Sequence, residues 1–186
     1  GLRAAFFQFA QRDSMLYITG GYCYTLDSST YMTHPNLIAV NIKNLLDDVA
    51  ANQPISQNFR MIQDSVFKVC GGNMYRLDTT FYLVVGHDFN NYNAVIDTLR
   101  FFTQHYTCEI RKFSINDDGV NLSISGYNAI HDSANFRRRD YNLVPQIFPD
   151  GTTGLTAFSG VFQYGIDYPY FNSINITPSG YDVINN

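Results

Sequence analysis

Tryptophan is absent from this chain of 186 residues, and charged residues make up only 15% of it. The formal net charge is −4, whereas a nucleic-acid-binding surface needs a clustered excess of Lys and Arg, so no nucleic-acid partner is predicted. No apolar run approaches the roughly 18 residues of a membrane-spanning helix. Residues 1–7 form a small apolar patch that lacks the length and the cleavage site of a signal peptide. We therefore expect this segment to lie inside a longer protein.

Cysteine is also scarce, with Cys23, Cys70 and Cys108 as its three positions. No two of them lie within four residues of each other, which excludes the usual zinc-binding spacings. One disulfide with a free thiol, or unpaired buried thiols, would both fit, and the buried thiols are favoured. The four histidines are scattered, and the neighbours His87 and Asp88 would point to opposite faces of a strand. No metal site and no cofactor is predicted.

Aromatic residues are abundant, with 14 Tyr and 15 Phe. Together with many β-branched residues they favour strands, and Gly, Asn, Asp and Pro separate the strand-length runs. The fold class predicted is all-β. Predicted strands include 37–42, 59–62, 67–72, 108–115, 122–127, 142–148 and 172–176. Short helices are predicted within loops at 44–51, capped by Asn44, and at 94–104.

A long-period repeat is the main organising signal. Residues 16–21 (LYITGG) are echoed by 82–87 (YLVVGH) and, more weakly, by 155–160 (LTAFSG). The matching glycines are 66 and 74 residues apart, longer than the roughly 50 residues of a kelch blade, so long loops must take up the surplus. We expect these loops at 23–36, 43–58, 88–107 and 163–170.

The run from Phe81 to Val85 is apolar at every position, which predicts a strand covered on both faces. A blade between two neighbouring blades provides such cover. The architecture predicted is a kelch-like β-propeller with about three four-stranded blades, at 1–65, 66–132 and, in part, 133–186. Three blades leave the ring incomplete, so the remaining blades, from the same full-length chain or from other subunits, are the first predicted partners.

The chain resembles kelch-repeat propeller proteins of Bacteroidetes, exported lipoprotein-like or type IX-secreted surface proteins. The similarity runs through 16–22, 35–40, 81–89, 110–113 and, most distinctively, 137–151 (RRRDYNLVPQIFPDG). It implies an extracellular or outer-membrane location on a larger propeller, with no established activity to carry over. The sequence departs from the kelch double glycine at Gly86-His87 and in the third echo.

Exported proteins of such bacteria carry O-glycans at Asp-Ser/Thr followed by a small or aliphatic residue. Five hydroxyls stand in this context: Ser14, Ser65, Thr79, Thr98 and Ser133. Turn formation explains the same Asp-Ser and Asp-Thr pairs, because both residue types favour strand ends. Both interpretations stay open.

Three loops rich in aromatic residues are the best candidates for ligand binding. The candidate residues are Tyr22, Tyr24, Tyr31, His87, Phe89, Asn91, Tyr92, Tyr168 and Tyr170. Each loop follows the second strand of its unit, so all three should emerge on one face of the propeller. Tyr and Asn suit recognition of carbohydrate or protein, although the same rings could pack the loops onto the blades.

Arg137, Arg138 and Arg139 form the one basic cluster. It could contact an acidic glycan or a lipid headgroup. We favour a structural role, in which the arginines alternate across the strand that begins a blade and pair with Asp140 or other acids.

No nucleophile elbow or phosphate-binding loop is present. The acid pairs Asp47-Asp48 and Asp117-Asp118 are explained by a helix start and a turn. The sequence therefore predicts an extracellular or cell-surface interaction module for a glycan or an envelope protein. The alternatives are a glycan-active or galactose-oxidase-like enzyme and a structural subunit of a surface assembly.

Overall fold

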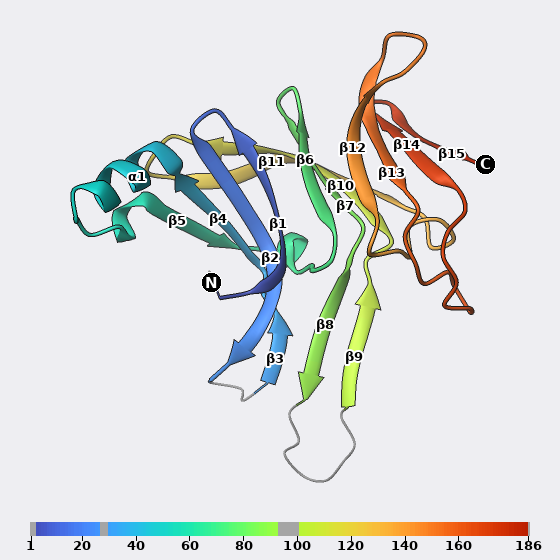
Figure 1. Cartoon of the computed structure of the whole chain (residues 1–186), viewed down its shortest axis with the longest axis horizontal. Coiled ribbons are helices and arrows are strands. Elements are labelled where there is room, and N and C mark those ends of the chain that lie inside the picture. Colours follow the sequence, from blue (N-terminus) through green and yellow to red (C-terminus); the bar gives the residue numbers. More distant parts are fainter. Residues whose placement is uncertain (1–2, 27–29, 93–100, 186) are drawn as a thin grey trace.

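The computed structural model describes residues 3–26, 30–92 and 101–185, which form fifteen β-strands and one α-helix. The all-β prediction is confirmed. The strands form three antiparallel sheets, and each sheet contains a meander of four strands (Figure 1). Successive strands of a meander pair side by side. In the first two sheets, additional strands are inserted into the chain between the second and third strands of the meander. No closed barrel or closed propeller ring is formed by the described residues.

The first sheet is built on β1 (Ala5–Arg12), β2 (Met15–Thr25), β4 (Asn36–Asn41) and β5 (Phe59–Gln63). The second sheet contains β6 (Asn73–Leu77), β7 (Thr80–Val84), β10 (Glu109–Asp117) and β11 (Leu122–His131). The third contains β12 (Asn142–Ile147), β13 (Thr153–Phe158), β14 (Ser173–Thr177) and β15 (Gly180–Ile184). The three sequence echoes fall on β2, β7 and β13, the second strand of each meander.

Each sheet carries an insertion between its second and third strands. β3 (Thr30–Thr33) follows β2, and the hairpin of β8 (His87–Tyr92) and β9 (Phe101–Tyr106) follows β7. β3 pairs with both β2 and β8, so the hairpin inserted in the second sheet extends the first sheet. The third insertion is the loop 159–172. Figure 1 shows β3, the β8–β9 hairpin and this loop at the same end of the sheets.

The first predicted helix is present as α1 (Ile42–Ala50) and begins earlier than expected. Its cap is Asn41 rather than Asn44, and the Asn41 side chain accepts a hydrogen bond from the Asn44 backbone N–H at 3.1 Å. The second predicted helix is wrong where the structure describes it, because residues 101–104 belong to β9; residues 94–100 lie outside the described residues. The aromatic and β-branched residues at 101–103 favour an extended conformation, and they pair with β8 in the sheet.

The strand predicted at 67–72 is also wrong. A 3₁₀ turn, η2 (Ser65–Phe67), stands at its start, and the first strand of the second sheet begins only at Asn73. Gly71 has a φ of 64°. A Cβ atom on Gly72 would lie within 2.8 Å of the backbone oxygens of Val84 and Val85, at the end of β7. The left-handed residue and the close backbone approach interrupt an extended strand at this point.

Strand β7 of the second sheet is buried on both faces, as the apolar run 81–85 predicts. Phe81 and Leu83 of β7 pack with Phe113 of β10 in a core shared with the first sheet. Tyr82 and Val84, on the opposite face, belong to the core shared with the third sheet. The buried Tyr141 hydroxyl also donates to the Val84 carbonyl at 2.7 Å. The second sheet therefore holds the other two in place.

The two outer faces of the assembly differ in chemistry. On the first sheet, Phe7, Phe9 and Met61 lie on the side away from the second sheet and are 43%, 59% and 53% exposed. Their register partners Ile18 and Ile38 are apolar too. The corresponding side of the third sheet carries several polar residues, including Thr156, Asn175 and Asp182. That side of the third sheet also exposes Phe158 and Ile184, so it is mixed, whereas the outer face of the first sheet is apolar at the positions named.

An ion pair joins β5 of the first sheet to the end of β10 in the second sheet. Arg60 of β5 binds both carboxylate oxygens of Asp117 of β10, at 2.7 and 2.8 Å, and the Asp117 side chain is 2% exposed. The buried Tyr17 hydroxyl lies 3.1 Å from the same carboxylate. Asp118, next in the chain, instead accepts hydrogen bonds from the backbone N–H groups of its own turn. The local-structure interpretation of the acid pair is correct for Asp118 and incomplete for Asp117.

We predict that Asp117→Asn lowers the free energy of unfolding by about 3 kcal/mol, because it leaves the Arg60 guanidinium with no carboxylate at this sheet contact. Asp118→Asn, in an exposed turn, should have a much smaller effect. Urea denaturation of both variants measures the difference. Equal midpoints for the two variants would contradict the assigned role of Asp117.

Candidate binding site

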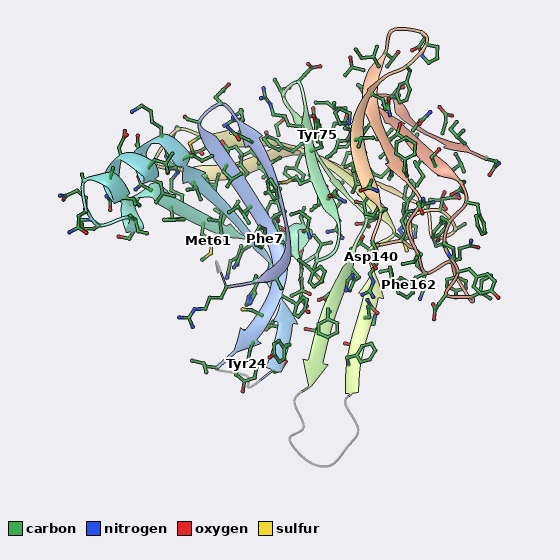
Figure 2. All side chains as sticks on the ribbon, in the orientation of Figure 1. Phe7, Tyr24, Met61, Tyr75, Asp140 and Phe162 are labelled. Carbon is green, nitrogen blue, oxygen red and sulfur yellow. The ribbon has the colours of Figure 1, made fainter. Side chains whose placement is uncertain are left out.

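Aromatic side chains gather at the end of the sheets where the three insertions lie. We call this surface the aromatic end, defined by its exposed rings: Tyr24, Tyr31, Phe102, Tyr164, Tyr168 and Phe171. Tyr164, Tyr168 and Phe171 are 77%, 63% and 73% exposed. Figure 2 labels Tyr24 on the first sheet at this end and Phe162 in the loop of the third. The insertions thus bring the three predicted aromatic segments to one end of the molecule.

Strand pairing brings the rings of the first two insertions together. Tyr22 pairs with Thr33 across β2 and β3, and Tyr31 of β3 pairs with Asn91 of β8. The Tyr22 ring lies 5.0 Å from Phe89 and 6.4 Å from Tyr31, measured between ring centroids. These contacts unite residues that are far apart in the sequence.

A pocket of about 280 Å³ opens beside this cluster. Its lining comes from the start of β1, the end of β2, the start of β8 and the segments that precede β6 and β12: Phe6, Tyr22, Gly71, His87, Phe89, Arg139 and Asp140. Tyr22, His87, Phe89 and Arg139 are among the predicted binding or basic residues. Phe6 and Gly71 carried no sequence signal, and Asp140 was expected only as an arginine partner.

Three lining residues have left-handed backbone conformations. Phe6 and Asp140 both have a φ of 55°, and Gly71 has 64°. Asp adopts this region comparatively often, but a bulky residue such as Phe rarely does. The Phe6 carbonyl accepts hydrogen bonds from the Gln8 side chain at 2.6 Å and from the Gly71 N–H at 3.1 Å, and these hold the conformation. Strain of this kind is concentrated at functional sites in proteins.

His87 lies at the inner wall of the pocket and is 5% exposed. Its Nε2 lies 3.4 Å from the Cys70 Sγ, and its Nδ1 has no hydrogen-bond partner among the described residues. Burial, with a smaller contribution from Arg139, lowers the pKa of His87 to about 4, so the ring is neutral at physiological pH. Burial also raises the pKa of Cys70 to about 11. The pair is therefore a neutral imidazole beside a neutral thiol.

Arg139 and Asp140 form the charged wall of the pocket. The Arg139 Nε lies 3.3 Å from an Asp140 carboxylate oxygen but has no hydrogen bond of good geometry in the described structure. The Arg139 guanidinium also stacks over the Phe162 ring at 4.5 Å. Figure 2 shows Asp140 and Phe162 near one another, between the hairpin and the loop of the third sheet.

The other two arginines of the cluster have different surroundings. Arg138 is fully buried and donates to the carbonyls of Asn135 and Ser159, both at 2.7 Å, and to the Asn172 side-chain oxygen at 2.9 Å. Arg137 stacks on the Tyr106 ring at 4.3 Å and donates to the Phe162 carbonyl at 2.6 Å.

Two details of the predicted arginine arrangement are wrong. The arginines lie in an irregular segment before β12 and not alternately across a strand. Arg138 binds carbonyl and amide oxygens in place of the expected acids, because it closes the loop 159–172 onto the segment before β12. The other two arginines do lie near acids, Arg139 at 3.3 Å from Asp140 and Arg137 at 3.9 Å from Asp167.

The remaining candidate residues divide between surface and core. Tyr168 is exposed, whereas Tyr170 is buried and its hydroxyl contacts the carbonyls of Ala134 and Arg137 at 3.1 and 3.2 Å. Tyr170 therefore holds the loop in place through these contacts, and its buried side chain also lines a second pocket of about 260 Å³. Asn91 and Tyr92 belong to β8, but their side chains lie outside the described residues.

Four of the five glycosylation candidates, Ser14, Ser65, Thr79 and Ser133, are exposed, and Thr98 lies outside the described residues. The preceding aspartates also serve local turns. Asp13 and Asp78 have positive φ, and Asp64 and Asp132 accept backbone hydrogen bonds two residues on. The geometry is thus compatible with both interpretations of these pairs.

The three cysteines are free. Cys70 and Cys108 are buried as expected, whereas Cys23 is half-buried, with its Sγ 2.9 Å from the His34 Nε2. Within the described ranges, no group of three His, Cys, Asp or Glu residues is arranged to hold a metal ion. None of the described helices is long and apolar enough to cross a membrane.

No protein-family model and no curated protein matches the chain. Among solved structures, 41 chains match. One of them, described as "Structure of YjhT", is 10% identical; the match covers 98% of this chain and 84% of that one, with a TM-score of 0.25. A similarity of this size assigns neither a fold family nor a function.

We predict that His87 makes stability fall in acid. Its pKa is about 4 in the folded chain and near 6.5 in an unfolded one, so between these values the unfolded state binds a proton that the folded state does not. The free energy of unfolding should decrease by about 3 kcal/mol as the pH falls through this window. His87→Gln should remove this component in urea titrations across the window. Equal pH slopes for the two proteins would show that His87 does not contribute.

We predict that Arg138→Lys lowers the free energy of unfolding by about 3 kcal/mol, because a lysine cannot reproduce the forked hydrogen bonds to Ser159 and Asn172. Arg137→Lys, at a half-buried position, is the matched control and should cost less. Thermal melting and ligand binding are measured separately. Loss of binding with unchanged melting in Arg138→Lys would contradict the structural role.

Proposed function

We propose that this chain is an arc of a kelch-like β-propeller and serves as an interaction module at the extracellular or outer-membrane surface of a bacterium. Its ligand is a glycan or another envelope protein, bound at the aromatic end. The observation that carries the proposal is the gathering of exposed aromatic rings from three separate insertions at one end of the sheets.

Four features of the fold support the propeller arc. Each sheet contains a meander of four strands, and the middle sheet shares one buried core with each of the other two sheets. The first strands β1, β6 and β12 line one groove of about 450 Å³ and lie side by side in Figure 1, as the innermost strands around a propeller axis would. The apolar outer face of the first sheet is suited to one further blade, which would bury Phe7, Phe9 and Met61.

The chemistry of the aromatic end supports ligand binding. Large exposed apolar patches are uncommon on soluble proteins that have no partner, and they mark interaction surfaces. Tyrosine combines stacking area with a hydroxyl that can hydrogen-bond, which suits sugars and protein surfaces alike. The hairpin turns at the opposite end of the sheets expose mainly isolated aliphatic residues, such as Val120 and Ile147.

The surface location draws support from the exposed Asp-Ser and Asp-Thr positions. Four of these hydroxyls are accessible to a glycosylating enzyme in the folded chain. Mass analysis of glycopeptides from native material tests the location: glycan on at least one of them supports export, and bare hydroxyls remove this support.

We predict that replacing both Tyr164 and Tyr168 with Ser weakens binding about tenfold or more in a glycan-array screen and in cross-linking to envelope proteins. The matched control is the double variant Val120→Ser and Ile147→Ser, which removes equally exposed side chains from the opposite end and should bind as the wild type does. Equal binding by both double variants would place the function elsewhere. Bound copper or turnover of a glycan would favour the enzyme alternative, and the absence of any ligand would overturn the binding module.

A further inference from the structure

We propose that the pocket between Phe6, Tyr22, Phe89 and the Arg139–Asp140 pair binds one uncharged pyranose ring of a glycan. This inference rests on the proposed function and names the ligand class of one site within it. It is carried by the shape of the aromatic wall, the balance of charge and the size of the pocket.

The aromatic wall offers flat faces for stacking. Phe6 and Tyr22 are stacked, with ring centroids 5.8 Å apart and planes within 9° of each other, and Phe89 lies beyond Tyr22. Phe6 is 60% exposed although its backbone conformation is strained, so a costly local structure presents an apolar ring to solvent. The apolar C–H face of a pyranose is complementary to such a ring.

The polar wall recognises hydroxyl groups without favouring a net charge. Asp140 is 56% exposed at its side chain and keeps oxygens free to accept from hydroxyls, while Arg139 at 32% exposure can donate to them. A vicinal pair of sugar hydroxyls can satisfy both residues at once, because each hydroxyl both donates and accepts.

The same charges argue against ionic ligands. A cation such as a quaternary ammonium group prefers an aromatic cage with no competing positive charge, but here Arg139 borders the rings. A carboxylate or phosphate ligand would meet the Asp140 carboxylate. The neutral His87 ring does not shift the balance in either direction.

The size of the pocket sets the extent of recognition. At about 280 Å³ it falls just below the range of roughly 300–1,000 Å³ that holds drug-sized ligands, which suits a single ring. The pocket opens beside Tyr22, whose ring continues through Tyr31 to Tyr24. The remainder of a glycan would therefore lie along the aromatic end.

Ligand-observed NMR titration of the full chain tests the ligand class. The neutral probes are the methyl glycosides of glucose, galactose, mannose and N-acetylglucosamine, and the charged probes are glucuronate and glucosamine. At least one neutral glycoside should bind, and the charged sugars should bind about tenfold more weakly or worse. Preferred binding of glucuronate or glucosamine would overturn the assignment of an uncharged ring.

Two substitutions then locate the site. Tyr22→Ala removes a stacking ring, and Asp140→Asn removes the carboxylate while keeping a residue that tolerates positive φ. Each should weaken the neutral glycoside about tenfold or more. Tyr127→Ala is the matched control, since Tyr127 is an exposed tyrosine of β11, at 46% exposure, and belongs neither to the pocket nor to the aromatic end. Thermal melting confirms that each variant is folded.

The outcomes separate this inference from the proposed function. Unchanged glycoside binding in folded Tyr22→Ala and Asp140→Asn, with loss in the Tyr164 and Tyr168 double variant, would sink the pocket assignment and leave the binding module standing. Cross-linking to an envelope protein without binding of any glycoside would also contradict the pocket assignment and leave the binding module standing. Failure to bind any glycan or protein would remove both.

Discussion

The burial of β7, in the second sheet, on both of its faces is the constraint on which the rest of this structure depends. Residues of β7 alternate between two cores, with Phe81 and Leu83 facing the first sheet and Tyr82 and Val84 facing the third. Each fully buried side chain of this size is worth about 1.5–3 kcal/mol, so the two cores are the main source of free energy that fixes the sheets relative to one another. The packing of the sheets also brings together the beginning of β1 and the segments that precede β6 and β12. Phe6, Gly71 and Arg139 of these segments line one pocket.

The insertions after the second strands build on that stacking. β3 and the β8–β9 hairpin pair across the boundary between two sheets, which brings Tyr22 and Phe89 within contact. The third insertion is anchored by Arg138, whose buried guanidinium holds the loop 159–172 against the segment before β12. The two adjacent arginines therefore have different roles. Arg138 holds the loop in place, and Arg139 lines the pocket. The three sheets are held together by two buried cores, and the exposed rings lie on the insertions.

Much of the framework could be predicted from sequence because it follows from local periodicity. The three echoes fall on equivalent strands, the apolar run at 81–85 is buried, and the insertions follow the second strands. The failures occur where a long-range contact overrides the local pattern. Residues 67–72 look like a strand, yet Gly71 is left-handed and Gly72 packs against β7. Residues 101–104 have partial helical spacing, yet they pair with β8.

The sequence by itself determined the fold class, the second strand of each sheet and most of the aromatic residues at the candidate site, since composition and alternation are properties of neighbouring residues. Only the tertiary structure decided which of those rings meet. It buried Tyr170 and Arg138, joined Phe6 to Tyr22, and set Asp117 against Arg60 rather than leaving it in a turn. It also made one outer face apolar and the other more polar. These outcomes depend on which faces of separate sheets come together, and that choice is made by packing between segments far apart in the chain.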